Sequence, residues 1–338
     1  MVASARIETP TGRLTRGNNR LFRSATWRRQ EAAISLFIDL ETVRIVQQLS
    51  KQGIESVLLK GPVLARLLYS QEEPRGYVDI DLLVPPFEVE AALRLLAGQG
   101  YGDILASEIE RAPHARTLRR TVPDGTGAVD VDLHTSFHGV GVDPKEFWRA
   151  IRGEAETLAI SDSEVAVPST RAVALLVGLH ATAGGAARAK PLADLDRALG
   201  RLPDSLWGEA FGLAVQLRAE AWFLAGLDLS AEGRALVARC GFSGARSATA
   251  LLSSRGSPPT ALGIQRLFET GGWRNRWRLL ARELIPTAEF MRMSSPLAKR
   301  GLFGLLSAYA LRSLWLAAML PRGLRAVVAL RRDLRRTQ

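Results

Sequence analysis

Hydrophobic residues follow a helical period early in the chain and then give way to a short extended unit. Residues 32–49 carry apolar side chains at intervals of three or four, which predicts an amphipathic helix. Residues 56–59 form a short apolar run typical of a strand, and Pro62 then begins a helix that continues to about residue 69. Lys60 and Gly61 are therefore expected in the turn between this strand and this helix.

Strict alternation of apolar and polar residues marks the next strand. Over residues 77–84, every second residue is aliphatic and Asp79 and Asp81 fall on the opposite side, so both carboxylates are expected on one face of a strand. A helix over residues 86–97 and a further strand around residues 103–106 are expected to follow.

A β-hairpin is predicted over residues 117–134. Two runs of strand character, 117–122 and 128–134, are separated by a turn sequence, Pro-Asp-Gly-Thr-Gly. In the second run Asp130, Asp132 and His134 alternate with aliphatic residues, so these three polar side chains are predicted to share a face.

From Ser169 onward the apolar period is helical, with helices expected over residues 171–183, 192–199, 206–227 and further segments up to Arg336. The chain is therefore predicted to be an α+β protein with a mixed α/β half and an all-helical half. We expect a basic arm over residues 1–30, a first domain over 31–168 and a helical domain over 169–338, and two domains also fit the length of 338 residues.

The net charge of +11 is concentrated at the C-terminal end. Residues 271–338 hold 14 Lys and Arg against 3 Asp and Glu, so this stretch alone accounts for +11. Clustered cations favour a polyanionic partner such as RNA or a membrane surface. The alternative is a general arginine bias, because only five of the 45 basic residues are lysine.

Composition also indicates the compartment. The single cysteine, Cys240, excludes an internal disulfide and a thiolate zinc site, and the first residues contain no signal-peptide core, so a cytoplasmic protein is expected. Residues 302–320 are long and apolar enough to span a bilayer, but Arg312 lies in the middle. We therefore predict an amphipathic or buried helix there, with peripheral membrane contact conceivable but no stable insertion.

Two Asp-x-Asp pairs on neighbouring strands are the strongest chemical signal. Carboxylates held within a few ångströms repel one another, and a divalent cation such as Mg²⁺ removes this cost while also binding phosphate oxygens. The pairs therefore predict phosphoryl or nucleotidyl transfer. The alternative is that they line the water-exposed faces of two strands.

The surrounding sequence resembles a known family. The resemblance is carried by Leu58-Leu59-Lys60-Gly61-Pro62, Leu67, Tyr69, Arg75, Asp79-Ile80-Asp81-Leu82-Leu83-Val84 and Val131-Asp132-Leu133-His134, with weaker blocks at His180, Lys190, Leu192, Asp194-Leu195 and Ile285-Pro286-Thr287 through Met291. These blocks are similar to the uncharacterised bacterial nucleotidyltransferase family of the DNA polymerase β-like superfamily. The Lys-Gly turn departs from the superfamily's usual Gly-Ser turn.

The resemblance implies a metal-dependent enzyme that moves a nucleoside monophosphate from a triphosphate such as ATP to a hydroxyl. Asp79, Asp81 and Asp132 would hold Mg²⁺ or Mn²⁺, with Asp132 acting as base and Asp130 in reserve. Gly61 would let the backbone approach the phosphates, and Lys60 and Arg75 would pair with them. The acceptor stays open between RNA, a protein or peptide, and a small molecule.

Lys190 follows the flexible Gly184-Gly185 pair and is either a triphosphate ligand or a solvated surface lysine. His180 lies among leucine and valine residues and is expected to be a core histidine.

Two other functions stay open. A glycosyltransferase also uses an Asp-x-Asp motif, although it usually places several βα units before it, and a catalytically inactive nucleotide or RNA binder would depend on the basic C-terminal helices. The chain contains no P-loop, no Gly-x-Gly-x-x-Gly turn and no Gly-x-Ser-x-Gly elbow, which argues against three common enzyme classes.

Overall fold

The computed structural model describes residues 25–103, 114–122 and 127–336. Its first part is a mixed sheet with helices. The elements are α1 (Ala25–Lys51), β1 (Val57–Leu58), α2 (Pro62–Leu68), β2 (Asp79–Leu83), α3 (Val89–Gly98), β3 (Gly102–Asp103), β4 (Ala115–Thr121), β5 (Ala128–His134), α4 (Pro144–Arg152), β6 (Glu156–Ile160) and β7 (Ser163–Val167).

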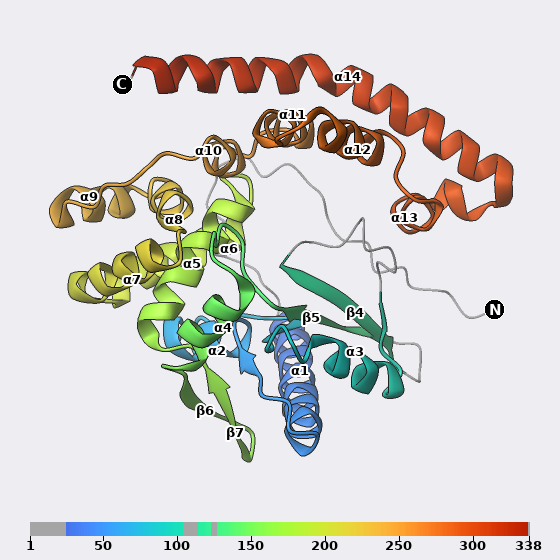
Figure 1. Ribbon diagram of the computed structural model, residues 1–338. Coiled ribbons are helices and arrows are strands. Elements are labelled where there is room, and N and C mark those ends of the chain that lie inside the picture. Colours follow the sequence, from blue (N-terminus) through green and yellow to red (C-terminus); the bar gives the residue numbers. More distant parts are fainter. Residues whose placement is uncertain (1–24, 104–113, 123–126, 337–338) are drawn as a thin grey trace.

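The second part is helical throughout the described residues. Its elements are α5 (Thr170–Gly184), α6 (Ala189–Arg201), α7 (Asp204–Gln216), α8 (Glu220–Leu227), α9 (Ala231–Cys240), α10 (Ala248–Ser254), α11 (Pro259–Glu269), α12 (Trp273–Leu284), α13 (Ala288–Ser294), a 3₁₀ turn η1 (Pro296–Lys299) and α14 (Gly301–Arg336). The predicted α+β fold, a mixed-sheet domain followed by helices, is confirmed (Figure 1).

The five-stranded sheet has the order β1-β2-β5-β4-β3. β2 and β5 are parallel neighbours, whereas β1, β4 and β3 join the sheet antiparallel to their neighbours. The predicted hairpin is confirmed as β4 and β5, and its turn, like most of the strand expected over residues 103–106, lies outside the described residues. The parallel pair β2–β5 is the part of the sheet that positions the site.

Differences from the sequence-based elements have local causes. Helix α1 begins at Ala25, within the segment predicted as a basic arm, and the rest of that arm lies outside the described residues. The single helix expected over residues 206–227 is instead α7 and α8, because Arg218 adopts a φ of 51° between them. The β6–β7 hairpin was not predicted, and its turn contains Ser161 with a φ of 51°.

The hydrophobic core does not divide between residues 168 and 169. One cluster of buried side chains runs from Ile38 on α1 to Leu236 on α9 and includes residues from the sheet and from α5 to α8. The later helices hold two separate smaller clusters, one around Leu252 and Leu330 and one around Met291 and Leu305. The sheet and the first helices therefore share a core, and α10 to α14 form a further layer (Figure 1).

Close helix packing in the shared core depends on glycine. A Cβ atom at Gly226 on α8 would lie 2.1 Å from the carbonyl oxygen of Gly178 on α5, and one at Gly178 would lie 2.7 Å from the Phe223 ring. The backbones of α5 and α8 can approach this closely because neither residue has a side chain. The packing fixes α5, which carries His180 toward the sheet.

Helix α14 is neither short nor buried. Within the described part of the chain it is the one helix long and apolar enough to cross a membrane, by length and composition alone, and 17% of its most apolar stretch is buried. Of the two predicted alternatives, an amphipathic or a buried helix, the buried one is therefore wrong. Arg312 lies on its packed side, where Nη2 donates to the backbone oxygen of Glu283 at 3.0 Å.

Candidate functional site

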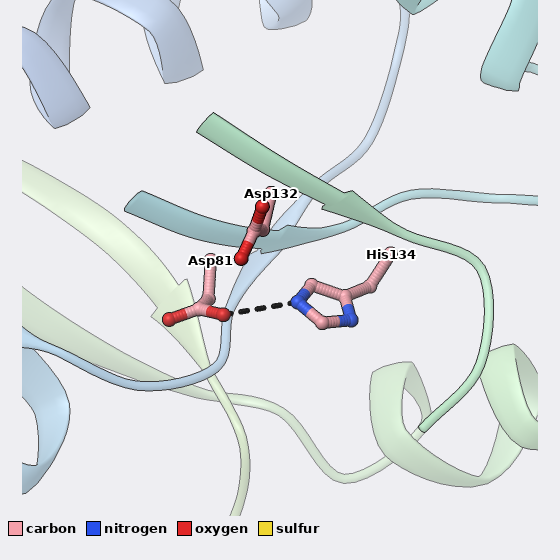
Figure 2. A group of neighbouring side chains, drawn as sticks. All are labelled: Asp81, Asp132 and His134. Carbon is pink, nitrogen blue, oxygen red and sulfur yellow. Dashed lines mark hydrogen bonds and ion pairs between the residues drawn. The ribbon is translucent and has the colours of Figure 1, made fainter. Parts of the chain in front are cut away.

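The carboxylates of Asp81 and Asp132 lie side by side because β2 and β5 are parallel and in register. Asp81 is directly opposite Asp132, and Asp79 is directly opposite Asp130. One ligand atom from each of Asp81, Asp132 and His134 lies within 4.8 Å of the others (Figure 2). Among the described residues this is the one group of three or more potential metal ligands that converges in this way.

Asp81 is buried between a cation and an imidazole. Its Oδ1 lies 2.7 Å from Lys60 Nζ and 3.0 Å from His134 Nε2. Burial alone would raise the pKa of Asp81, but the Lys60 ammonium and the hydrogen bond from His134 hold this pKa well below its ordinary value. Because an ionised carboxylate only accepts hydrogen bonds, His134 donates through Nε2–H, which leaves its Nδ1 buried and unpartnered among the described residues.

Asp79 and Asp132 complete the acidic surface of the two strands. Burial and the neighbouring Asp81 carboxylate raise the pKa of Asp79, with a smaller contribution from Asp132. Asp132 accepts a hydrogen bond from Thr117 Oγ1 at 2.5 Å. Asp79 is outside the group of converging ligand atoms, although its carboxyl group is close enough to be affected by both neighbours.

Asp130 has a different environment from Asp132. Both of its carboxylate oxygens pair with Arg119, each at 2.6 Å, at a partly exposed position on the neighbouring strand β4. Asp130 therefore fits the alternative that the acidic residues line a solvated strand face. Asp81 does not, because it is buried in the converging group.

The turn that carries Lys60 is fixed by backbone geometry. The backbone N–H of Leu59 donates to the carbonyl oxygen of Asp81 at 2.9 Å, which places Lys60 beside the carboxylate. Gly61 follows with a φ of 59°, a conformation that favours glycine, and Pro62 begins α2. The Lys60 ammonium also lies 5.4 Å from the centre of the Phe137 ring.

Arg75 has a partner that the sequence did not indicate. Its Nε and Nη2 donate to the two carboxylate oxygens of Asp194 at 2.7 and 2.9 Å, and the two side chains are only 6% and 1% exposed. The Tyr69 hydroxyl donates to the same carboxylate at 2.7 Å. Arg75, which the sequence predicted to bind phosphate, thus joins the loop before β2 to α6, since Asp194 lies on the buried face of that helix.

Lys190 lies in the first turn of the same helix. Desolvation and the nearby Arg75 cation lower the pKa of Lys190, whereas Asp79 and Asp194 oppose this effect. Lys190 is therefore close enough to Asp79 to interact with it electrostatically, while its side chain still reaches solvent. The Arg75–Asp194 pair holds the helix that presents it.

All four histidines of the chain gather around Lys60. The rings of His114 and His138 are 3.8 Å apart between centroids, and those of His114 and His134 are 6.0 Å apart. Burial, with Lys60 and neighbouring imidazoles contributing, lowers the pKa of His114 to about 4 and that of His138 to about 2. These imidazoles are therefore neutral near pH 7.

His180 also faces this region from α5. Burial first, and then the Lys60 charge, lower its pKa to about 4. The sequence predicted that His180 is a core histidine, but not that it lies near Lys60 and Asp81. No sequence signal joins these histidines, because three separate segments carry them.

The site thus consists of two aspartates in register, Asp81 buried and Asp132 half-buried, beside Lys60. Such a set of oxygen ligands and a cation is suited to binding a metal ion together with phosphate. The family model described as an uncharacterised nucleotidyltransferase matches residues 21–233. The chain belongs to this nucleotidyltransferase family, as its motifs predicted. The match ends before α10, so the weak block from Ile285 to Met291 lies outside it.

Solved structures give weaker likenesses. ANT(2'')-Ia, an antibiotic-resistance factor, has 14% identity and a TM-score of 0.37, covering 56% of this chain and 94% of its own. A nucleotidyltransferase-like protein from Paracoccidioides brasiliensis has 14% identity and a TM-score of 0.36, covering 55% and 93%. The lincosamide antibiotic adenylyltransferase LnuA has 15% identity and a TM-score of 0.33, covering 47% and 95%. No curated protein sequence matches the chain, so the family assignment depends on the family model.

Proposed function

We propose that this protein transfers a nucleoside monophosphate from a nucleoside triphosphate to a hydroxyl group of an acceptor. The observation that carries the proposal is the convergence of Asp81, Asp132 and His134, next to Lys60 and at the junction with α6. Family membership supports nucleotidyl transfer in general, and the acidic site supports the form that depends on metal.

The donor set fits a divalent cation. Asp81 and Asp132 supply the oxygen ligands that Mg²⁺ and Mn²⁺ prefer, and Asp79 adds a third carboxyl group, whose pKa is raised by burial first and then by the Asp81 carboxylate. When bound, the metal would supply charge neutralisation at the triphosphate. His134 contributes by orienting Asp81 through its Nε2–H.

The remaining groups have roles that their positions support. Lys60 and Lys190 are cations near enough to Asp79 to counter the rise in its pKa, and they would pair with phosphate oxygens as compact charges. Asp132 would accept the proton of the acceptor hydroxyl. The hydroxyl oxygen of the acceptor attacks the α-phosphorus, and pyrophosphate leaves. We assign Arg75 to holding α6 in place, because Asp194 engages its guanidinium.

The test is pyrophosphate release by the purified protein with Mg²⁺ or Mn²⁺ and each of the four nucleoside triphosphates, together with mass shifts on RNA, peptide and small-molecule acceptors. Asp81→Asn and Asp132→Asn should each lower the rate by about 10³-fold, because each removes several kcal/mol of charge stabilisation. Asp130→Asn is the matched control and should retain activity, since Asp130 pairs with Arg119.

Equal activity in Asp81→Asn and the unaltered protein would refute the site. If no triphosphate releases pyrophosphate but labelled triphosphate still binds, the protein is instead an inactive nucleotide binder.

A further inference from the structure

Helix α14 has apolar residues on two opposite sides. One side packs against the layer beneath it, where Leu305 and Ala308 join one small cluster and Val327 and Leu330 join another. Helices α10 and α11 and the 3₁₀ turn η1 are its partners on this side. Packing on this side therefore does not explain why the opposite side of α14 is also apolar.

The other side is an exposed apolar stripe. Its members recur at intervals of three or four residues, so they follow one line along the helix: Phe303, Leu306, Ala310, Leu314, Ala317, Pro321, Leu324 and Val328. Phe303 is 86% exposed, Leu314 68% and Leu306 57%. The stripe is about 38 Å long at 1.5 Å per residue, which is more continuous apolar surface than a water-soluble monomer usually presents.

Positive charge lies near the C-terminal half of this stripe. The segment from residue 271 to 338 has a net charge of +11, equal to that of the whole chain. On α14 itself, Arg322, Arg325 and Arg332 are exposed near the C-terminal half of the stripe. Arg312 leaves the apolar part uninterrupted, because its guanidinium turns toward the carbonyl oxygen of Glu283 and the Phe290 ring.

We propose that the exposed stripe of α14 docks on an anionic lipid bilayer, with the helix lying in the interface. An apolar face with arginines at its edge is the arrangement that binds such surfaces, since burial of apolar area and attraction to anionic headgroups add. A second copy of the chain would bring two +11 segments together. A protein partner would need an acidic rim, whereas the bilayer supplies both acyl chains and negative charge.

Docking leaves the proposed catalytic site free. Figure 1 shows α14 along the outside of α10, α11 and α12, on the side away from the sheet. The helix therefore reaches the lipid while the sheet and α5 to α9 project away from it. A spanning orientation is disfavoured, because the packed side of α14 would have to separate from its partners.

The experiment is flotation of the full-length protein with vesicles of phosphatidylcholine alone or mixed with phosphatidylglycerol. The protein should float with the anionic vesicles, and raised salt should weaken the binding. The double variant Leu306→Gln/Leu314→Gln should lower partitioning by at least about tenfold, because two exposed side chains lose their apolar gain. Phe87→Ser/Val215→Ser, at exposed positions 68% and 52% accessible outside α14, should leave it unchanged.

A charge series separates the two contributions. Arg322→Gln/Arg325→Gln/Arg332→Gln should reduce binding to anionic vesicles, whereas the matched triple change of the exposed Arg94, Arg149 and Arg201 to Gln should not. Circular dichroism and urea unfolding confirm that each variant is folded. Equal flotation of all variants, or of none, would overturn the proposal.

Two further outcomes would also overturn it. A lipid-free dimer in sedimentation velocity that Leu306→Gln/Leu314→Gln dissociates would make a second copy the occupant of the stripe. Resistance of bound protein to extraction with alkaline carbonate would show a helix that spans the bilayer rather than one that lies on its surface.

Discussion

Replacing Asp194 with alanine should lower the free energy of unfolding by about 3 to 5 kcal/mol, because it leaves a buried guanidinium without its partner. Arg75 is 6% exposed and donates twice to Asp194, so water cannot replace the lost carboxylate. The Tyr69 hydroxyl loses its acceptor at the same time. Removal of both charges in Arg75→Met/Asp194→Leu should cost less than Asp194→Ala alone, since no charge remains buried.

The assay is urea unfolding followed by tryptophan fluorescence, for which the buried Trp207 on α7 is a reporter within the same core. Asp196→Ala is the matched control, because Asp196 lies on the same helix but is exposed. Its effect should stay within about 0.5 kcal/mol. The reasoning is refuted if Asp194→Ala and Asp196→Ala unfold at the same urea concentration, or if the double variant loses more stability than Asp194→Ala.

Two other predictions concern stability. Glu41 accepts hydrogen bonds from Arg44, Tyr101 and Arg120, and although burial opposes it, these partners lower its pKa from 4.5. Because the pKa of Glu41 is lower in the folded protein, the ionised carboxylate stabilises the fold above pH 4.5, and this stability is lost as the pH falls through the folded-state pKa. The destabilisation by Glu41→Gln should therefore be largest at pH 7 and shrink below pH 4. A destabilisation independent of pH would contradict this. Gly226→Ala should destabilise by about 1 to 3 kcal/mol through a clash with α5. In thermal unfolding, Gly212→Ala should instead stabilise by about 0.5 to 1 kcal/mol, because the space around its Cβ is open. The packing argument is refuted if Gly226→Ala and Gly212→Ala change the stability in the same direction.

Period-two alternation was enough to predict that the aspartates of each strand share one face of that strand. Asp79 and Asp81 alternate with Ile80 and Leu82, whose side chains are fully buried, so the face of each aspartate followed from the pattern. The same logic placed Asp132 on β5. Parallel pairing between β2 and β5 then brings the two strands into register, although no local signal specifies which strands pair.

Long-range partners were beyond the reach of sequence patterns. Arg75 and Asp194 are 119 residues apart, and each reads locally as an ordinary surface charge in a polar loop or on an amphipathic helix. The break at Arg218 has no glycine or proline to announce it. It is supported by tertiary contact, since the backbone N–H of Gly141 donates to the carbonyl oxygen of Leu217 at 3.0 Å.

The buried residues divide the chain into a unit that contains the candidate catalytic site and a set of helices that carries the apolar stripe. The shared core ends at Leu236 and the family match ends at residue 233, so the sheet and α5 to α8 lie within the segment that matches the nucleotidyltransferase family. Within that unit, β2 and β5 supply Asp81 and Asp132, the turn after β1 supplies Lys60, and α6 supplies Lys190. The Arg75–Asp194 pair joins α6 to the loop before β2. Helices α10 to α14 add little to this core but carry the chain's excess positive charge and its exposed apolar stripe. Changes on α14 should therefore alter where the protein acts, and changes at Asp81 should alter whether it acts, because the two surfaces share neither core residues nor side-chain partners among those described.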